Sequence, residues 1–205
     1  MGRSDYSAAH IRVLEAGEAV RSRPAMYFGA SRDDPNLASR VVGAVLSDLL
    51  HSHAQDDLPT PARVRAEISS AVAFSVSSDQ TAAFDDDQLP RRGCFGVIGP
   101  NLWAPAAAAA LSSHAVAEIW YDGRGFRQLL TQLPPDPPIE PFTPERHGRG
   151  VHITYELDTA FLGADASITT ALDTLICHDN RCPPDCSPGE VTILDRRTGT
   201  QQHIH

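Results

Sequence analysis

The spacing of apolar residues predicts helices alternating with β-hairpins along this chain. Apolar positions recur at helical spacing over residues 11–23 and 36–53, and they alternate with polar positions over 63–70 and 72–77. An alanine-rich stretch at 104–113 predicts a further helix, and strand patterns return at 115–133, 151–157, 190–196 and 200–205. A last helix is expected at 165–176, with these residues facing inward: Ile168, Ala171, Leu172 and Leu175. This order predicts an α+β two-layer sandwich.

Turn-forming residues and prolines set the expected boundaries. Pro24 disfavours helix at the preceding residue, so the first helix should end near position 23. Residues 26–28 then form an apolar plug, and Asn36 is the expected N-cap of the second helix. Asp122-Gly123 predicts a tight hairpin turn. The proline-rich residues 134–144 must be extended and cannot join the middle of a sheet.

Composition narrows the class of protein. With 205 residues, 41% of them apolar and 21% charged, the chain suits one globular domain. It has no run of about 18 apolar residues and no secretory leader pattern, so we expect a cytoplasmic protein that does not bind membranes. A net charge of −9 argues against direct DNA binding. All 17 basic residues are arginine, which suggests a high-GC bacterial genome and excludes lysine chemistry.

The stretch "IRVLEAGEAVRSRPAMYFGA", residues 11–30, resembles the opening of the ATPase domain of the DNA gyrase B subunit and related type II topoisomerases. The positions that match the family pattern are Val13, Leu14, Ala19, Val20, Arg21, Arg23, Pro24, Met26, Tyr27 and Gly29. The resemblance implies the GHKL (Bergerat) sandwich, with helices on one face of a mixed, mostly antiparallel sheet. Weaker similarities follow in order to the last hairpin, and we expect a GHKL-like domain without the family's transducer domain.

The resemblance also implies the domain layout. Residues 1–10 look like the family's dimer-swapping arm, with Tyr6 at the arm's tyrosine, so we expect a homodimer formed through this arm. Residues 11–205 would be a single degenerate GHKL-like domain. Within it, 79–99 looks like a shortened, mobile form of the family's ATP lid, and 177–189 is a cysteine-rich insertion.

Residues that the family uses for ATP hydrolysis are replaced. In the family, a Glu on the second helix activates water and an Asn holds magnesium; here Gly43 and Ser47 stand at these positions. Ser78 replaces the adenine-reading Asp, and Arg149 replaces a Thr after the strand-entry Gly. The glycine-rich lid becomes "IGPNLWA", residues 98–104, too bulky for close backbone approach to phosphates. We therefore expect neither ATP nor magnesium to be used by the family mechanism.

The replacement residues can line a new polar cavity. His51 lies four residues after Ser47, on the same helical face, and Asp79 is placed to orient its imidazole. We therefore assign His51 and Asp79 as candidate catalytic residues. The candidate ligand-binding residues are Ser47, Ser78, Asn101, Trp103 and Arg149. The alternative is that all of these side chains are solvated or structurally satisfied.

The segment "ICHDNRCPPDCSP" supplies a candidate zinc site. Its candidate ligands are Cys177, His178, Cys182 and Cys186, since three thiolates and an imidazole can complete a tetrahedral zinc site. The spacing departs from the usual C-x-x-C knuckle, and three solitary thiols or a disulfide are the alternatives.

Three functions from different classes agree with the sequence. The first is a small-molecule site in the former nucleotide pocket, in an enzyme or binding protein of bacterial secondary metabolism. The second is a non-catalytic dimerisation or regulatory module that binds a protein partner. The third is a zinc-dependent enzyme that uses the cysteine-rich loop.

The zinc hypothesis makes a direct prediction. We expect native mass spectrometry of the full chain to show about one zinc ion per chain. A chelator should remove that ion and unfold the cysteine-rich segment, because such a loop has too few apolar residues to fold alone. A metal-free chain whose thiols all react freely would contradict this assignment.

Overall fold

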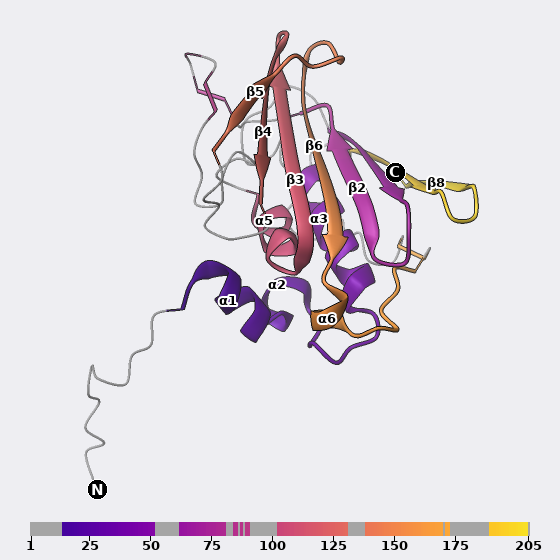
Figure 1. Ribbon diagram of the computed structural model, residues 1–205. Coiled ribbons are helices and arrows are strands. Elements are labelled where there is room, and N and C mark those ends of the chain that lie inside the picture. Colours follow the sequence, from indigo (N-terminus) through magenta and orange to yellow (C-terminus); the bar gives the residue numbers. More distant parts are fainter. Residues whose placement is uncertain are drawn as a thin grey trace, which may run out of the picture.

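The computed structural model of the chain (Figure 1) describes residues 14–51, 62–80, 84–85, 87, 89–90, 102–130, 138–169, 171–172 and 189–204. The helices in these residues are α1 Ala16–Ser22, α2 Ala25–Phe28, α3 Leu37–Leu50, α5 Trp103–Ala110 and α6 Thr159–Leu162. The strands are β1 Arg63–Ile68, β2 Ala73–Ser78, β3 Ser112–Tyr121, β4 Arg124–Leu129, β5 Glu140–Phe142, β6 Arg149–Leu157, β7 Glu190–Asp195 and β8 Thr200–Ile204.

The described strands form one sheet in the order β5-β4-β3-β6-β2-β1-β7-β8. Strands β1 and β7 pair in parallel, and the other neighbours pair antiparallel. Helices α3 and α5 lie against one face of this sheet (Figure 1). The predicted α+β sandwich with a mixed, mostly antiparallel sheet is therefore confirmed.

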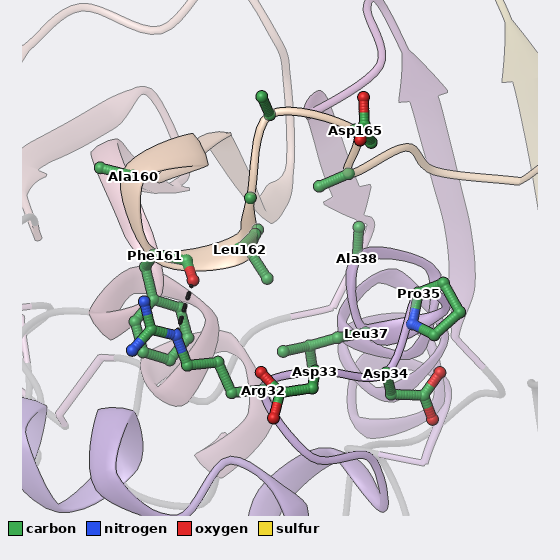
Figure 2. A pocket seen from close by; sticks show the side chains of 13 residues that line it. Arg32, Asp33, Asp34, Pro35, Leu37, Ala38, Ala160, Phe161, Leu162 and Asp165 are labelled. Carbon is green, nitrogen blue, oxygen red and sulfur yellow. Dashed lines mark hydrogen bonds between the residues drawn. The ribbon is translucent and has the colours of Figure 1, made fainter.

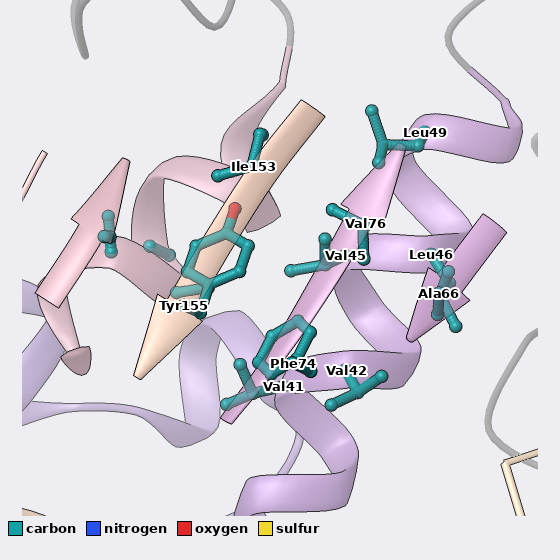
Figure 3. Close-up of a cluster of buried hydrophobic side chains, with 14 of the residues drawn as sticks. Val41, Val42, Val45, Leu46, Leu49, Ala66, Phe74, Val76, Ile153 and Tyr155 are labelled. Atoms are coloured by element: carbon teal, nitrogen blue, oxygen red, sulfur yellow. The ribbon is translucent and has the colours of Figure 1, made fainter. Parts of the chain in front are cut away.

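The core lies between α3 and the centre of the sheet (Figure 3). Alternate residues of β2 and β6 turn toward the helix, as the period of two along a strand requires. Phe74 and Tyr155 stack with ring centroids 4.8 Å apart, beneath the apolar face of α3. That face is fully buried and consists of Val41, Val42, Val45, Leu46 and Leu49.

The arginine-rich opening motif has a structural role. The Arg21 Nε–H donates to the Ala110 carbonyl at the end of α5 (2.7 Å), one of the carbonyls that a helix C-terminus leaves without an intrahelical partner. A second nitrogen of the same guanidinium pairs with Asp158 at 2.9 Å, and the group also lies over the Phe161 ring. Arg21 thus ties α1 to α5 and to the segment after β6.

Most predicted elements are confirmed, with boundaries shifted by a few residues. Helix α1 ends at Ser22, and the helix expected at 36–53 is α3. Asp122 and Gly123 both have positive φ, as the predicted tight hairpin turn between β3 and β4 requires. In the described part of 134–144 the strand is β5, a short strand at the sheet edge. An edge position is expected, because proline has no N–H to donate to a neighbouring strand, and a central strand has neighbours on both sides.

The prediction of an apolar plug at residues 26–28 is wrong for the first of them, Met26. Met26 is 73% exposed, whereas Phe28 is buried and Tyr27 half-buried. The short helix α2 turns successive side chains by about 100°, so three consecutive residues cannot all face the core. Asn36 does occupy the position before α3, but its side chain makes no capping hydrogen bond.

The helix expected at 165–176 is absent from the part that the structure describes, residues 165–169 and 171–172. Ile168 and Leu172 are buried as predicted, but Ala171 is exposed. The backbone here bonds to other segments: the Ile168 N–H donates to Ala71 O (2.7 Å) and the Thr169 N–H to Ser39 Oγ (2.8 Å). These tertiary hydrogen bonds replace the helical ladder.

Several predictions lie outside the described residues. They concern the arm at 1–10, most of the lid segment 79–99, residues 173–176 of the expected last helix, and the cysteine-rich segment up to residue 188. Phe84 and Pro90 are described within the lid segment, where they form an isolated bridge.

An ion pair between buried Asp195 and Arg197 holds the segment around residue 168 to the last hairpin. The Asp195 carboxylate, 3% exposed, accepts hydrogen bonds from Arg197 Nε (2.9 Å) and from another guanidinium nitrogen (2.7 Å). Arg197 also donates to the Ile168 carbonyl. The hydrogen bonds from Arg197 lower the pKa of Asp195 below its ordinary value.

We expect Asp195→Asn to lower the free energy of unfolding at pH 7 by about 1.5–3 kcal/mol, the range for hydrogen bonds to charged groups. Because the folded-state pKa of Asp195 is lowered, its contribution is full above the unfolded pKa, about 3.9, and is lost as the pH falls through the folded value. Urea unfolding at pH 7 and pH 3 should therefore show a smaller difference between wild type and variant at pH 3. Asp165→Asn, at an exposed position, is the control. Equal losses in both variants would contradict the prediction.

Candidate functional site

Four elements carry those predicted catalytic and ligand-binding residues that the structure describes, at one end of the sandwich, here called the site end. It consists of the C-terminal ends of α3 and β2 and the N-terminal ends of α5 and β6. In Figure 3, Leu49 and Val76 lie toward one end of α3 and β2, and Val41 and Phe74 toward the other, so the two elements run in the same direction. Strand β6 is antiparallel to β2, with Ser78 opposite Val151, so it begins at this end.

His51 follows α3 directly and is buried. Its Nδ1 lies 2.6 Å from the Ser47 carbonyl oxygen, one helical turn earlier. Since a carbonyl only accepts hydrogen bonds, Nδ1 carries the proton in this contact. When the ring is neutral, Nε2 is the nitrogen that can accept a proton. His51 therefore contacts the residue one helical turn before it, as its spacing predicted, but the contact is with the Ser47 backbone carbonyl.

The residues after β2 are held by local hydrogen bonds. The Asp79 carboxylate is exposed and accepts from the Arg63 backbone N–H (2.9 Å), at the start of β1. Ser78 is buried, and its hydroxyl accepts from the Gln80 N–H (3.2 Å). Because the described hydrogen bond of Asp79 goes to Arg63, its orientation of His51 stays a prediction.

The remaining described candidates stand at the rim of the site end. The Arg149 guanidinium lies over the Tyr121 ring, 5.3 Å from its centroid, and Phe84 of the lid segment packs on the same ring at 5.8 Å. Trp103 begins α5 and is 55% exposed. Asn101 and the four predicted zinc ligands lie outside the described residues. Within the residues described, no three His, Cys, Asp or Glu side chains are grouped closely enough to hold a metal ion.

A buried polar link joins α3, α5 and β6, and the sequence analysis missed it. Asp48 is buried, and its carboxylate accepts from the Ala104 N–H (2.8 Å) in the first turn of α5. The Tyr155 hydroxyl donates to the Pro105 carbonyl (3.1 Å). Burial and then the nearby Asp48 charge raise the pKa of Tyr155, so its hydroxyl stays protonated. One acid within the apolar run "AVLSDLL" was the available signal.

Two further cavities lie beside the sheet. The first, of about 360 Å³, lies between the α2–α3 loop and α6 (Figure 2). The Arg32 Nε–H donates to the Phe161 carbonyl (2.9 Å) on its wall, and Asp33, Asp34 and Asp165 also line it. This cavity lies by the N-terminal end of α3, so it is separate from the site end. The second, of about 310 Å³, involves Trp120 and His152.

Comparison with solved structures identifies the fold. The crystal structure of the 43K ATPase domain of Thermus thermophilus gyrase B, in complex with an aminocoumarin, superposes with a TM-score of 0.62 over 97% of this chain. The chain has the GHKL fold. The two sequences are 17% identical, and this chain spans 53% of the length of that one. No protein-family model and no curated protein sequence matches the chain. None of the helices in the described residues is long and apolar enough to cross a membrane.

Gly150 fixes how closely β6 approaches its neighbours at the site end. A Cβ at this position would overlap the Trp120 indole and lie 2.7 Å from the Ser78 carbonyl oxygen. Movement of the Trp120 side chain can relieve only the first contact, because the second is with a backbone oxygen.

We expect Gly150→Ala to lower the free energy of unfolding by about 1–3 kcal/mol, the usual cost of overpacking. In a Trp120→Phe background the cost should fall, since the smaller ring relieves one of the two overlaps. Urea unfolding of the four chains of this double-mutant cycle measures both values. A Gly150→Ala variant as stable as the wild type would contradict the close approach.

Proposed function

We propose that this GHKL-fold chain does not hydrolyse ATP by a carboxylate-base mechanism and that its site end binds a small molecule instead. The observation that carries the first part is the acid content of α3. Its sequence, "LASRVVGAVLSDLL", contains one acidic residue, Asp48. That carboxylate is buried and binds the Ala104 backbone N–H. A general base must reach the water that it activates, and Asp48 is engaged in holding α5.

Gly43 supports the same conclusion. It lies within α3, is buried, and stands where the resemblance places the water-activating Glu. A glycine has no group that can accept a proton. One helical turn on, Ser47 offers a single hydroxyl in place of the amide oxygen expected for magnesium, a poorer oxygen donor set for this ion.

The proposal that the site end binds a small molecule rests on its buried polar side chains. Four of the buried polar residues belong to its elements: Asp48, His51, Ser78 and Gln80. Ligand sites combine an apolar lining with a few polar groups that fix orientation. His51 is the candidate proton acceptor, and Arg149 at the rim is the candidate anion-binding group. A bound molecule with both a proton to give and a negative group suits this pair.

A second candidate is a non-catalytic dimer that acts through a protein partner. It rests on the arm-like sequence at 1–10, with Tyr6, which favours homodimerisation. In this candidate the site end would be structural, and pocket substitutions would leave partner binding unchanged.

We expect gently purified full chain to carry a small ligand, detected as extra mass by native mass spectrometry. His51→Ala should lower its occupancy at least about tenfold, equivalent to 1.4 kcal/mol, because a buried hydrogen-bonding group is lost. His114→Ala is the matched control, since His114 is exposed at the other end of the sheet. The same spectra report whether the chain is a dimer.

Phosphate release from ATP and magnesium should equal the protein-free background. Saturable, magnesium-dependent hydrolysis would contradict the proposed loss of ATPase activity. A ligand-free chain, or equal ligand loss in both histidine variants, would contradict the small-molecule site and favour the partner-binding dimer.

A further inference from the structure

The second cavity lies on the face of the sheet opposite α3 and α5. Glu118, Trp120 and His152 line it, and they alternate along β3 and β6 with the buried residues that face the helices. Its wall is completed by β4 and by the segment that follows β5, residues 142–146. At about 310 Å³, it is at the lower end of the usual range for ligand sites, about 300–1,000 Å³.

Two residues that line this cavity each have a buried side-chain nitrogen without a hydrogen-bond partner among the described residues. They are Trp120 Nε1 and His152 Nδ1. Trp120 is only 5% exposed, so bulk water does not solvate its indole. An indole N–H only donates, so whatever satisfies it must bring an acceptor atom. Buried donors without partners are rare in folded proteins, and a bound molecule that brings an acceptor is one way to satisfy them.

Among the described charged groups around the cavity, one arginine has no ion pair. The Glu118 carboxylate is paired with Arg127 (2.6 Å), and Arg127 also lies over the Phe142 ring. Arg146 lies over the Trp120 ring, 5.3 Å from its centroid, and no ion pair of Arg146 occurs among the described residues. Glu145 is exposed on the same segment.

His152 is uncharged at neutral pH. Burial lowers its pKa, and the charge of Arg146 lowers it further, while Glu118 and Glu67 act in the opposite direction. Its Nε2 lies 3.4 Å from Thr154 Oγ1. The neutral ring can therefore present Nδ1 to a ligand as a donor or as an acceptor.

We propose that this cavity, here called the open-face pocket, binds a small aromatic carboxylate. One carboxylate oxygen accepts from Trp120 Nε1 and His152 Nδ1, and Arg146 supplies the opposing charge. The aromatic walls, Trp120 and Phe142, favour a flat body over a branched aliphatic one. The open-face pocket is independent of the small-molecule site proposed above, because the two lie on different faces of β6.

The test uses the indole N–H signals of the full chain, which contains two tryptophans. In protein labelled with ¹⁵N-tryptophan, benzoate and indole-3-carboxylate are titrated separately to about 10 mM, a range that detects millimolar affinity. We expect the Trp120 Nε1–H signal to shift downfield with saturation for at least one of them. Trp103, at the site end, is the internal reference and should not shift. Benzyl alcohol, the uncharged probe, should bind at least about fivefold more weakly than benzoate.

Two arginine variants test the charge. Arg146→Gln should weaken carboxylate binding at least about fivefold, and Arg124→Gln, at an exposed position outside the pocket, should leave it unchanged. A dispersed spectrum of each variant establishes that it is folded. The proposal is overturned if neither carboxylate shifts the Trp120 signal, if Trp103 alone responds, or if Arg146→Gln binds as tightly as the wild type. Trp103 responding alone would instead support a ligand at the site end.

Discussion

The packing of α3 against β1 and β2 is the contact on which the other parts of the structure depend. Its apolar face, from Val41 to Leu49, is fully buried on Phe74 and Tyr155. Burying such side chains contributes about 1.5–3 kcal/mol each. The register of the helix on the sheet also fixes where Asp48 and His51 lie, and Asp48 then fixes the start of α5. A shift of α3 by one turn would break the core and the site end together.

The opening arginine motif has a structural role that does not depend on whether the chain hydrolyses ATP. In this structure Arg21 binds the Ala110 carbonyl and Asp158, and it lies over Phe161. These contacts are made within the chain and join the first helix to α5 and α6. A chain that kept the fold and lost the hydrolytic residues would therefore still require this arginine. The motif is evidence for the architecture, and the replacements at Gly43 and Ser47 bear on the activity.

The sequence predicted the elements whose cause is local. Asp122-Gly123 specifies a two-residue turn, and the alternation in β6 reports a strand with one buried face. The prediction from sequence failed where tertiary contacts determine the backbone conformation. Residues 165–172 have helical spacing, but their backbone bonds to Ala71 and Ser39 instead. Of the candidate site, the resemblance pointed to Ser47 and Ser78, and helical spacing pointed to His51; that these side chains line one cavity stays a prediction. The hydrogen bond of Asp79 to Arg63 depends on strand register, which no local pattern encodes.

Strand β6 separates the two sites proposed above, because its alternate residues face opposite sides of the sheet. Its odd-numbered residues face the helices, beginning with Arg149 at the site end and continuing through Tyr155 in the core. Its even-numbered residues face the other way and include Gly150 and His152. Gly150 couples the two faces, because its missing side chain admits the Trp120 indole and lets β6 lie close to the Ser78 carbonyl. We therefore expect substitutions on the helix-covered side of β6 to leave the open face intact, provided that Gly150 is kept.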